Sequence, residues 1–137
     1  MTKSFTAQMD DWVKKTKLRQ DLVIRQSTDD VFGLASRTAT AMARGGSVKE
    51  GFVPRDTGAL AASAMTTLQG STILTGAGAD SYVMVVAQMK GGDTATMVWT
   101  APYARRQHYE TGWLWVDYAA RQWPAIVRAN AARARSI

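Results

Sequence analysis

The chain has 137 residues, of which 46% are apolar and 20% charged, typical of a single globular domain with one hydrophobic core. It contains no cysteine and one histidine, which excludes disulfide scaffolds, thiol nucleophiles, cysteine-based zinc sites and multi-histidine metal sites. The net charge of +6 indicates a basic surface, and the shortage of catalytic side chains favours binding or assembly over catalysis.

The positive charge lies at the two ends of the chain. Residues 1–44 carry eight Lys and Arg against five Asp, and residues 101–137 carry six Arg against two acidic residues. The middle, residues 45–100, is nearly neutral, with three basic and four acidic residues. No apolar stretch approaches the roughly 20 residues of a membrane span, and no signal-peptide core precedes Asp10, so we expect synthesis in the cytoplasm without membrane contact.

Residues 1–44 are predicted to be helical, in two helices. The second helix begins at Ser27, where Ser followed three residues later by Asp30 is a capping-box pattern, and ends at Gly45-Gly46. Asp29-Asp30 then act as first-turn charges. Residues 22–24 fit either a helical turn or a short strand. The first helix covers residues 4–18, and Ser4 can cap its start. Its apolar positions recur at spacings of three and four: Phe5, Met9, Trp12 and Thr16.

The neutral middle is predicted to be a loop and turn over residues 45–62, followed by strands over residues 63–100. Asp56 or Thr57 caps the short Ala-rich turn. The valine-rich run at residues 81–89 is the most strand-like segment. The other strands are expected at residues 63–68, around 72–74 and at 94–100, which together form an antiparallel meander.

Residues 101–137 are again predicted to be helical. Pro102 favours a helix start before residues 103–110, and a last helix covers residues 116–136. Pro124 either kinks this helix or begins a new one after Trp123. The final ten residues, 128–137, are expected to be helical only when packed against a partner. The predicted fold class is therefore α+β in a single domain, with N-terminal helices, a small antiparallel sheet and C-terminal helices.

Two short patterns suggest catalysis or metal binding, and both have simpler explanations. His108-x-Glu110 is similar to the start of a zinc deaminase signature, but the cysteine ligands of such a site are absent. Adjacent carboxylates such as Asp29-Asp30 point about 100° apart on a helix and do not converge on one ion. We expect no catalytic residue, no cofactor and no metal, and a hydrolase using His108 and Glu110 ranks last among the hypotheses.

Aromatic residues and arginines crowd the last third of the chain. Part of this cluster must belong to the core. Trp113-x-Trp115 follows a glycine, and we favour exposed apolar surface, which marks an interface, over a pure core position. The same mixture fits base stacking and phosphate contacts, so a small basic DNA- or RNA-binding protein is the main alternative. The candidate interface residues are Trp113, Trp115, Arg105, Arg106, Arg121 and Trp123.

Two segments in combination are more specific than either alone. The first runs from Pro54 through Asp56-Thr57-Gly58 to Ser63, and the second runs from Pro102-Tyr103-Ala104 to Gly112. With its helical N-terminal third and its strands between them, the chain resembles the tail-completion and head–tail joining (minor tail or neck) proteins of long-tailed bacteriophages. The matching motif positions are Pro54, Asp56, Thr57, Gly58, Leu60 and Ser63, then Pro102, Tyr103, Ala104, Glu110 and Gly112.

The resemblance implies a virion protein without catalysis, located in the neck and made in the bacterial host cytoplasm. It implies a homo-oligomeric ring, expected to be a hexamer, between the portal connector or stopper and the tail terminator or tail tube. Genomic DNA would pass through this ring without sequence-specific contact. Rings need heterologous interfaces, for which the N-terminal helix and the basic, aromatic C-terminal region are candidates. The motif residues would be structural, with Tyr103 and Glu110 on one helix face.

Overall fold

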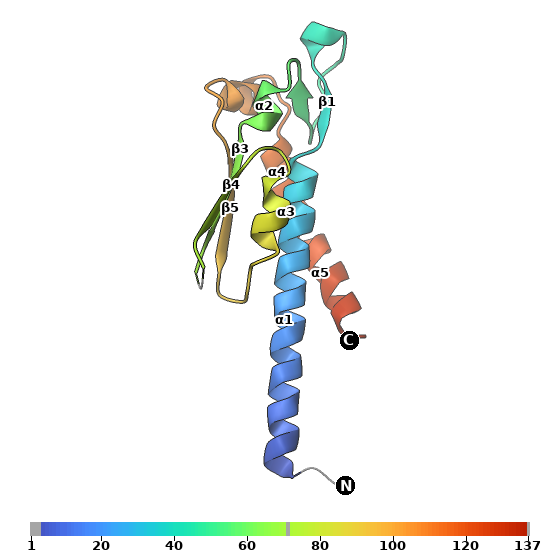
Figure 1. Cartoon of the computed structure of the whole chain (residues 1–137). Coiled ribbons are helices and arrows are strands. Elements are labelled where there is room, and N and C mark those ends of the chain that lie inside the picture. Colours follow the sequence, from blue (N-terminus) through green and yellow to red (C-terminus); the bar gives the residue numbers. More distant parts are fainter. Residues whose placement is uncertain (1–3, 71, 137) are drawn as a thin grey trace.

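The computed structural model describes residues 4–70 and 72–136, and it confirms the predicted α+β class. The chain begins with one long helix, α1 (Phe5–Ala35). The other elements are β1 (Thr38–Thr40), the 3₁₀ turn η1 (Met42–Arg44), β2 (Val53–Arg55), α2 (Ala59–Ala62), β3 (Ala64–Gln69), β4 (Leu74–Ala77), α3 (Ser81–Val86), β5 (Thr94–Trp99), the π-helix η2 (Arg106–Glu110), α4 (Trp115–Arg121) and α5 (Trp123–Ala134). Helices α3, α4 and α5 pack along the C-terminal half of α1, and β1 and α2 lie beyond its end (Figure 1).

The N-terminal region is one helix of 31 residues, so the prediction of two helices is wrong. Ser4 caps its start, accepting a hydrogen bond from the Ala7 amide at 3.2 Å. Residues 22–24 are helical, and the helix ends at Ala35 rather than at Gly45-Gly46. The capping-box interpretation of Ser27 fails because Ser27 lies inside the helix and its fully buried hydroxyl has a tertiary partner. Asp29-Asp30 are likewise inside α1, not in a first turn.

The partner of Ser27 is Asn130 on α5, which packs against α1 near the C-terminal end of the chain (Figure 1). The Asn130 amide nitrogen donates to Ser27 Oγ at 3.2 Å and to Asp30 Oδ2 at 3.0 Å. Both Ser27 and Asn130 are buried. α5 therefore packs on a helix of its own chain, whereas the sequence suggested packing against a partner. Pro124 lies in the first turn of α5, which confirms a new helix after α4.

The three-stranded antiparallel sheet has the order β4-β3-β5, with β3 in the centre. β3 pairs with β5 from Ala64–Trp99 to Gln69–Thr94, and with β4 on its other edge. The prediction of a meander is wrong, because consecutive strands of a meander are neighbours. Here β4 and β5 lie on opposite edges of the sheet, with β3 between them. β1 and β2 form a separate parallel pair, which the sequence pattern did not indicate.

The valine-rich segment connecting β4 to β5 is helix α3, so the strand predicted at residues 81–89 is wrong. Val85 and Met89 are buried with Leu68 of β3 in a small core between this segment and the sheet. The Tyr82 ring meets Phe32 of α1 edge-on, with centroids 6.5 Å apart. Packing on two sides thus overrides the weak preference of β-branched residues for strands.

The region beyond the C-terminal end of α1, which contains β1, β2, α2 and η2, is called the head (Figure 1). A second core lies there. Its buried members are Val53, Leu60, Ala104, Trp113 and Trp115. Val53 lies in β2 and Leu60 in α2, whereas Ala104 lies just before η2, Trp113 between η2 and α4, and Trp115 at the start of α4. This core therefore joins parts of the chain that are distant in sequence. No helix within residues 4–70 or 72–136 combines the length and apolar character needed to cross a bilayer.

Replacing Asn130 with alanine tests the attachment of α5 to α1. The substitution leaves buried Ser27 without the hydrogen bond from Asn130, so we expect the free energy of unfolding to fall by about 1–3 kcal/mol. Arg128→Ala, at an exposed position of the same helix, is the control and should change stability little. Chemical denaturation measures both. Equal stability of N130A and R128A would contradict this description of the helix pair.

Candidate interaction surface

The two motif segments meet around one cavity of about 370 Å³ in the head. Most positions of the first segment line this cavity. Tyr103 of the second segment lines it too, although it is far from the first segment in sequence. Trp113 also contributes to the lining. The motif residues that line the cavity are Pro54, Asp56, Thr57, Gly58, Leu60 and Tyr103.

The first motif segment is a chain reversal held by its own side chains. Gly58 has φ of 89°, in the left-handed region where any other side chain is strained, and directly precedes α2. The Thr57 hydroxyl accepts from the Ala59 amide at 3.3 Å, so Thr57 rather than Asp56 makes the capping contact. Asp56 instead forms an exposed ion pair with Arg44 at 2.7 Å. Ser63 closes the turn, donating through its hydroxyl to the Leu60 carbonyl at 2.6 Å.

The second motif segment contains a π-helix, η2, where an α-helix was predicted. Tyr103 lies before it and lines the cavity, whereas Glu110 lies at its end and pairs with Arg106 at 3.5 Å. The expectation that Tyr103 and Glu110 share one face of an α-helix is therefore wrong. Gly112, with φ of 89°, follows η2 and redirects the chain.

Trp113 and Trp115 are the largest fully buried side chains, each 1% exposed. The expectation that they present apolar surface to a partner is therefore wrong for this chain. The Trp115 ring meets Trp99 of β5 with centroids 5.8 Å apart, and Leu114 between the two tryptophans has an unusual φ of 44°. Burial of two indoles supplies much of the apolar area of a small core, which accounts for their inward position.

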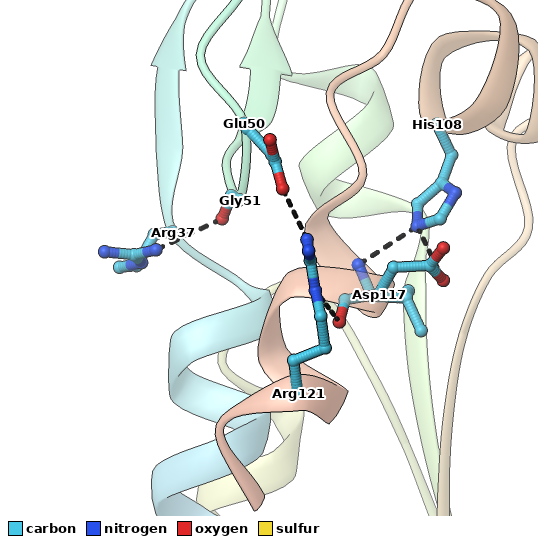
Figure 2. Close-up of polar contacts among 7 residues, drawn as sticks. Arg37, Glu50, Gly51, His108, Asp117 and Arg121 are labelled. Atoms are coloured by element: carbon cyan, nitrogen blue, oxygen red, sulfur yellow. Dashed lines mark hydrogen bonds and ion pairs between the residues drawn. The ribbon is translucent and has the colours of Figure 1, made fainter.

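His108 is also buried, at 4% exposure, and it stabilises the start of α4 (Figure 2). Its Nε2 accepts from the Val116 amide at 3.1 Å and lies 3.9 Å from Asp117 Oδ1. Burial lowers the pKa of His108 below 6.5, and the Asp117 charge opposes this shift only in part. A neutral ring with its proton on Nδ1 suits an acceptor at Nε2. Glu110, its supposed catalytic partner, is exposed and paired with Arg106.

Two arginines hold the loop before β2 against the helices (Figure 2). Arg37 donates to the Gly51 carbonyl at 3.3 Å, and its guanidinium lies 4.1 Å from the centroid of the Phe52 ring. Arg121 forms an ion pair with Glu50 and so contributes to the packing of its own chain, although it remains exposed. Sequence reasoning missed Arg37, because its partners lie in a loop that no local pattern connects to the end of α1.

The remaining interface candidates occupy two different places. Arg105 and Arg106 are exposed beside Tyr109, around a hollow of about 470 Å³ that Glu110 completes. The Arg105 guanidinium lies 6.0 Å from the Tyr109 ring centroid. Trp123, by contrast, is half-buried in a groove between α1 and α5 on another part of the molecule.

The largest unpacked feature is the N-terminal half of α1, which projects away from the sheet, α3 and α4 (Figure 1). It carries three large apolar side chains at helical spacing: Phe5, Met9 and Trp12, which are 77%, 43% and 63% exposed. Such side chains on a projecting helix are typical of an interface. The sequence pattern indicated their common face, but only the structure shows that no element of residues 4–70 and 72–136 covers them.

Comparison of the chain with protein-family models, with curated proteins and with solved structures gives no significant match. Within the described parts of the chain, no three carboxylate or histidine side chains are grouped so as to hold a metal ion.

The buried His108 predicts a pH-dependent stability. Its folded pKa is below the ordinary 6.5 of the unfolded chain, so the unfolded state binds protons first. Stability from this group is full above about pH 6.5 and declines as the pH falls from there towards the lower folded pKa. His108→Gln, which keeps an acceptor but cannot titrate, should flatten this decline in urea unfolding measured from about pH 7.5 to 5. An unchanged slope in H108Q would show that other groups cause it.

Proposed function

We propose that the chain is a non-catalytic structural protein of the phage neck, which forms a ring joining the capsid connector to the tail tube. The observation that carries this proposal is the projecting half of α1 with its exposed Phe5 and Trp12. Half of this 31-residue helix lacks tertiary packing in the single chain, and an unpacked helix segment is only marginally stable in water. Assembly with other subunits would cover it.

The motif segments support the same proposal through their position. The turn at Asp56-Thr57-Gly58 and the segment at Tyr103 come together in the head, although they are far apart in sequence. The motif that the resemblance rests on thus builds one compact region, as expected for residues that maintain a subunit's shape. The resemblance implies the other features of the proposed ring, namely its location in the virion, its hexameric state, its contacts with connector and tail proteins, and the passage of DNA.

A small nucleic-acid-binding protein is the second candidate, and one surface favours it. Arg105 and Arg106 are exposed beside Tyr109, which is 60% exposed, so two cations and one aromatic ring share a hollow. That combination fits phosphate contacts with base stacking. In the proposed ring, the same patch would make weak, sequence-independent contacts with passing DNA.

Native mass spectrometry of the purified chain, alone and mixed with the connector and tail-tube proteins of the same phage, tests the proposal. We expect a closed oligomer that incorporates into the joined particle. A chain that stays monomeric and never joins particles would falsify the neck assignment.

Salt dependence separates the two candidates. Fluorescence anisotropy with a duplex of mixed sequence should give weak binding for a neck protein. Arg105→Glu combined with Arg106→Glu should reduce that binding while the fold is retained, because both side chains are exposed. Tight binding that falls steeply as salt rises, in a chain that does not assemble, would favour the nucleic-acid protein instead.

A further inference from the structure

The three-stranded sheet ends in two strands that each have one free edge. β4 and β5 lie on opposite sides of β3, and in the described parts of the chain no further strand pairs with either of them. A free edge exposes a row of unpaired backbone N–H and C=O groups, which soluble proteins commonly protect with charged residues, proline or a bulge. β4 and β5 contain no charged residue and no proline, and both pair with β3 in an unbroken register.

The backbone groups on the free edge of β4 belong to Thr75 and Ala77. The Gly78 amide donates to the Ala64 carbonyl at 2.8 Å. Because alternate residues of an antiparallel strand bond to the same neighbour, Gly76 also faces β3. Thr75 and Ala77 therefore direct their N–H and C=O groups away from β3. Both are exposed, so their side chains lie on the face of the sheet that α3 does not cover.

The backbone groups on the free edge of β5 belong to residues of the opposite face. The Thr100 amide donates to the Ser63 carbonyl at 3.0 Å. By the same alternation Thr96 bonds to β3, whereas Ala95 and Met97 direct their N–H and C=O groups away from it. Ala95 packs in the small core beneath α3, so these residues lie on the covered face of the sheet.

The two free edges fit each other in one orientation. β4 and β5 are both antiparallel to β3, so they run in the same direction. In a parallel pair, a residue bonds to the two residues that flank its neighbour on the other strand. Thr75 of one copy beside Thr96 of a second copy would thus bond to the free groups of Ala95 and Met97. An antiparallel pair would instead place the covered face of one sheet beside the exposed face of the other.

The free edge of β4 also has an apolar wall beside it. A groove of about 740 Å³ lies between β4 and α3. Val83 and Met84 of α3 line this groove and are 49% and 79% exposed. Of the described residues in its lining, Asp80 is the only charged one. A strand added to β4 would lie beside this wall, with its covered-face side chains directed towards Val83 and Met84.

We propose that β4 of one copy of this chain pairs in parallel with β5 of a neighbouring copy, so that the sheet continues from subunit to subunit. Addition of a strand to a free edge is a common recognition mode. A second copy satisfies both edges at once, whereas a strand of another protein would leave one edge free. The edges are two different patches, as a heterologous ring contact requires. This inference rests on the self-assembly in the proposed function and names the strands that would make it.

Proline at position 75 tests the free edge of β4. Thr75→Pro removes an N–H that faces away from β3, so the pairing of β3 with β4 should be retained. Thr75→Val, which keeps this N–H, is the matched control. We expect T75P to weaken self-association about ten-fold relative to T75V, which corresponds to the loss of one or two backbone hydrogen bonds. Sedimentation analysis measures association, and thermal unfolding verifies that both variants fold. Equal association of T75P and T75V would overturn the inference.

Disulfide cross-linking identifies the partner strand without depending on a disruptive variant. The chain has no cysteine, so each introduced thiol is the only one. A Thr75→Cys chain is mixed, in the assembled form, with a heavy-isotope chain that carries one cysteine on the exposed face of β5: Thr94→Cys, Thr96→Cys or Val98→Cys. At least one of these should form a mixed disulfide, because paired strands bring such residues within disulfide reach.

Thr67→Cys in the heavy-isotope chain is the control for this cross-linking. Thr67 lies on the same face of the sheet but in the central strand, so in the proposed contact it would be about 10 Å from Thr75 of the neighbouring copy and should not link. An assembled chain without a link from position 75 to β5, or with links to a connector or tail protein only, would overturn the inference and leave the proposed function in place. A wild-type chain that neither self-associates nor joins particles would overturn both, so the two failures are distinguishable.

Discussion

The pairing of α1 with α5 determines which surfaces of this protein remain available. Asn130 donates to Ser27 and Asp30, and these buried hydrogen bonds fix α5 along the C-terminal half of α1. A buried amide of this kind tolerates little displacement, because an unsatisfied polar group is costly. Since α5 ends partway along α1, the face it covers continues as bare apolar surface towards Phe5 (Figure 1).

The core of the head buries aromatic residues, which are therefore not available as an interaction surface. Trp113 and Trp115 fill its core, and His108 and Arg37 use their polar atoms to join η2, α4 and the loop before β2 (Figure 2). Trp113 and Trp115, two of the side chains that the sequence suggests as an interface, are therefore needed for folding. The interaction potential lies instead on the projecting helix and on the exposed hollow beside Tyr109.

The sequence predicted what depends on local patterns and misjudged what depends on packing. The α+β class, the cap at Ser4 and the restart at Pro124 were predictable, because each follows from nearby residues. Ser27 misled as a capping residue because its partner is a hundred residues away on α5. The valine run at 81–89 misled because its helix is stabilised by the sheet and α1, which no local preference records. For the candidate surface, the spacing from Phe5 to Trp12 was visible in the sequence, but its exposure was not.

Hydrogen–deuterium exchange of the amides in residues 5–18 shows whether assembly covers the projecting helix, because it reports packing in the unmodified chain. We expect rapid exchange in the dilute chain and strong protection in the assembled form, with little change in the already packed residues 24–35. Equal protection of residues 5–18 in both forms would contradict the claim that assembly covers this half of α1.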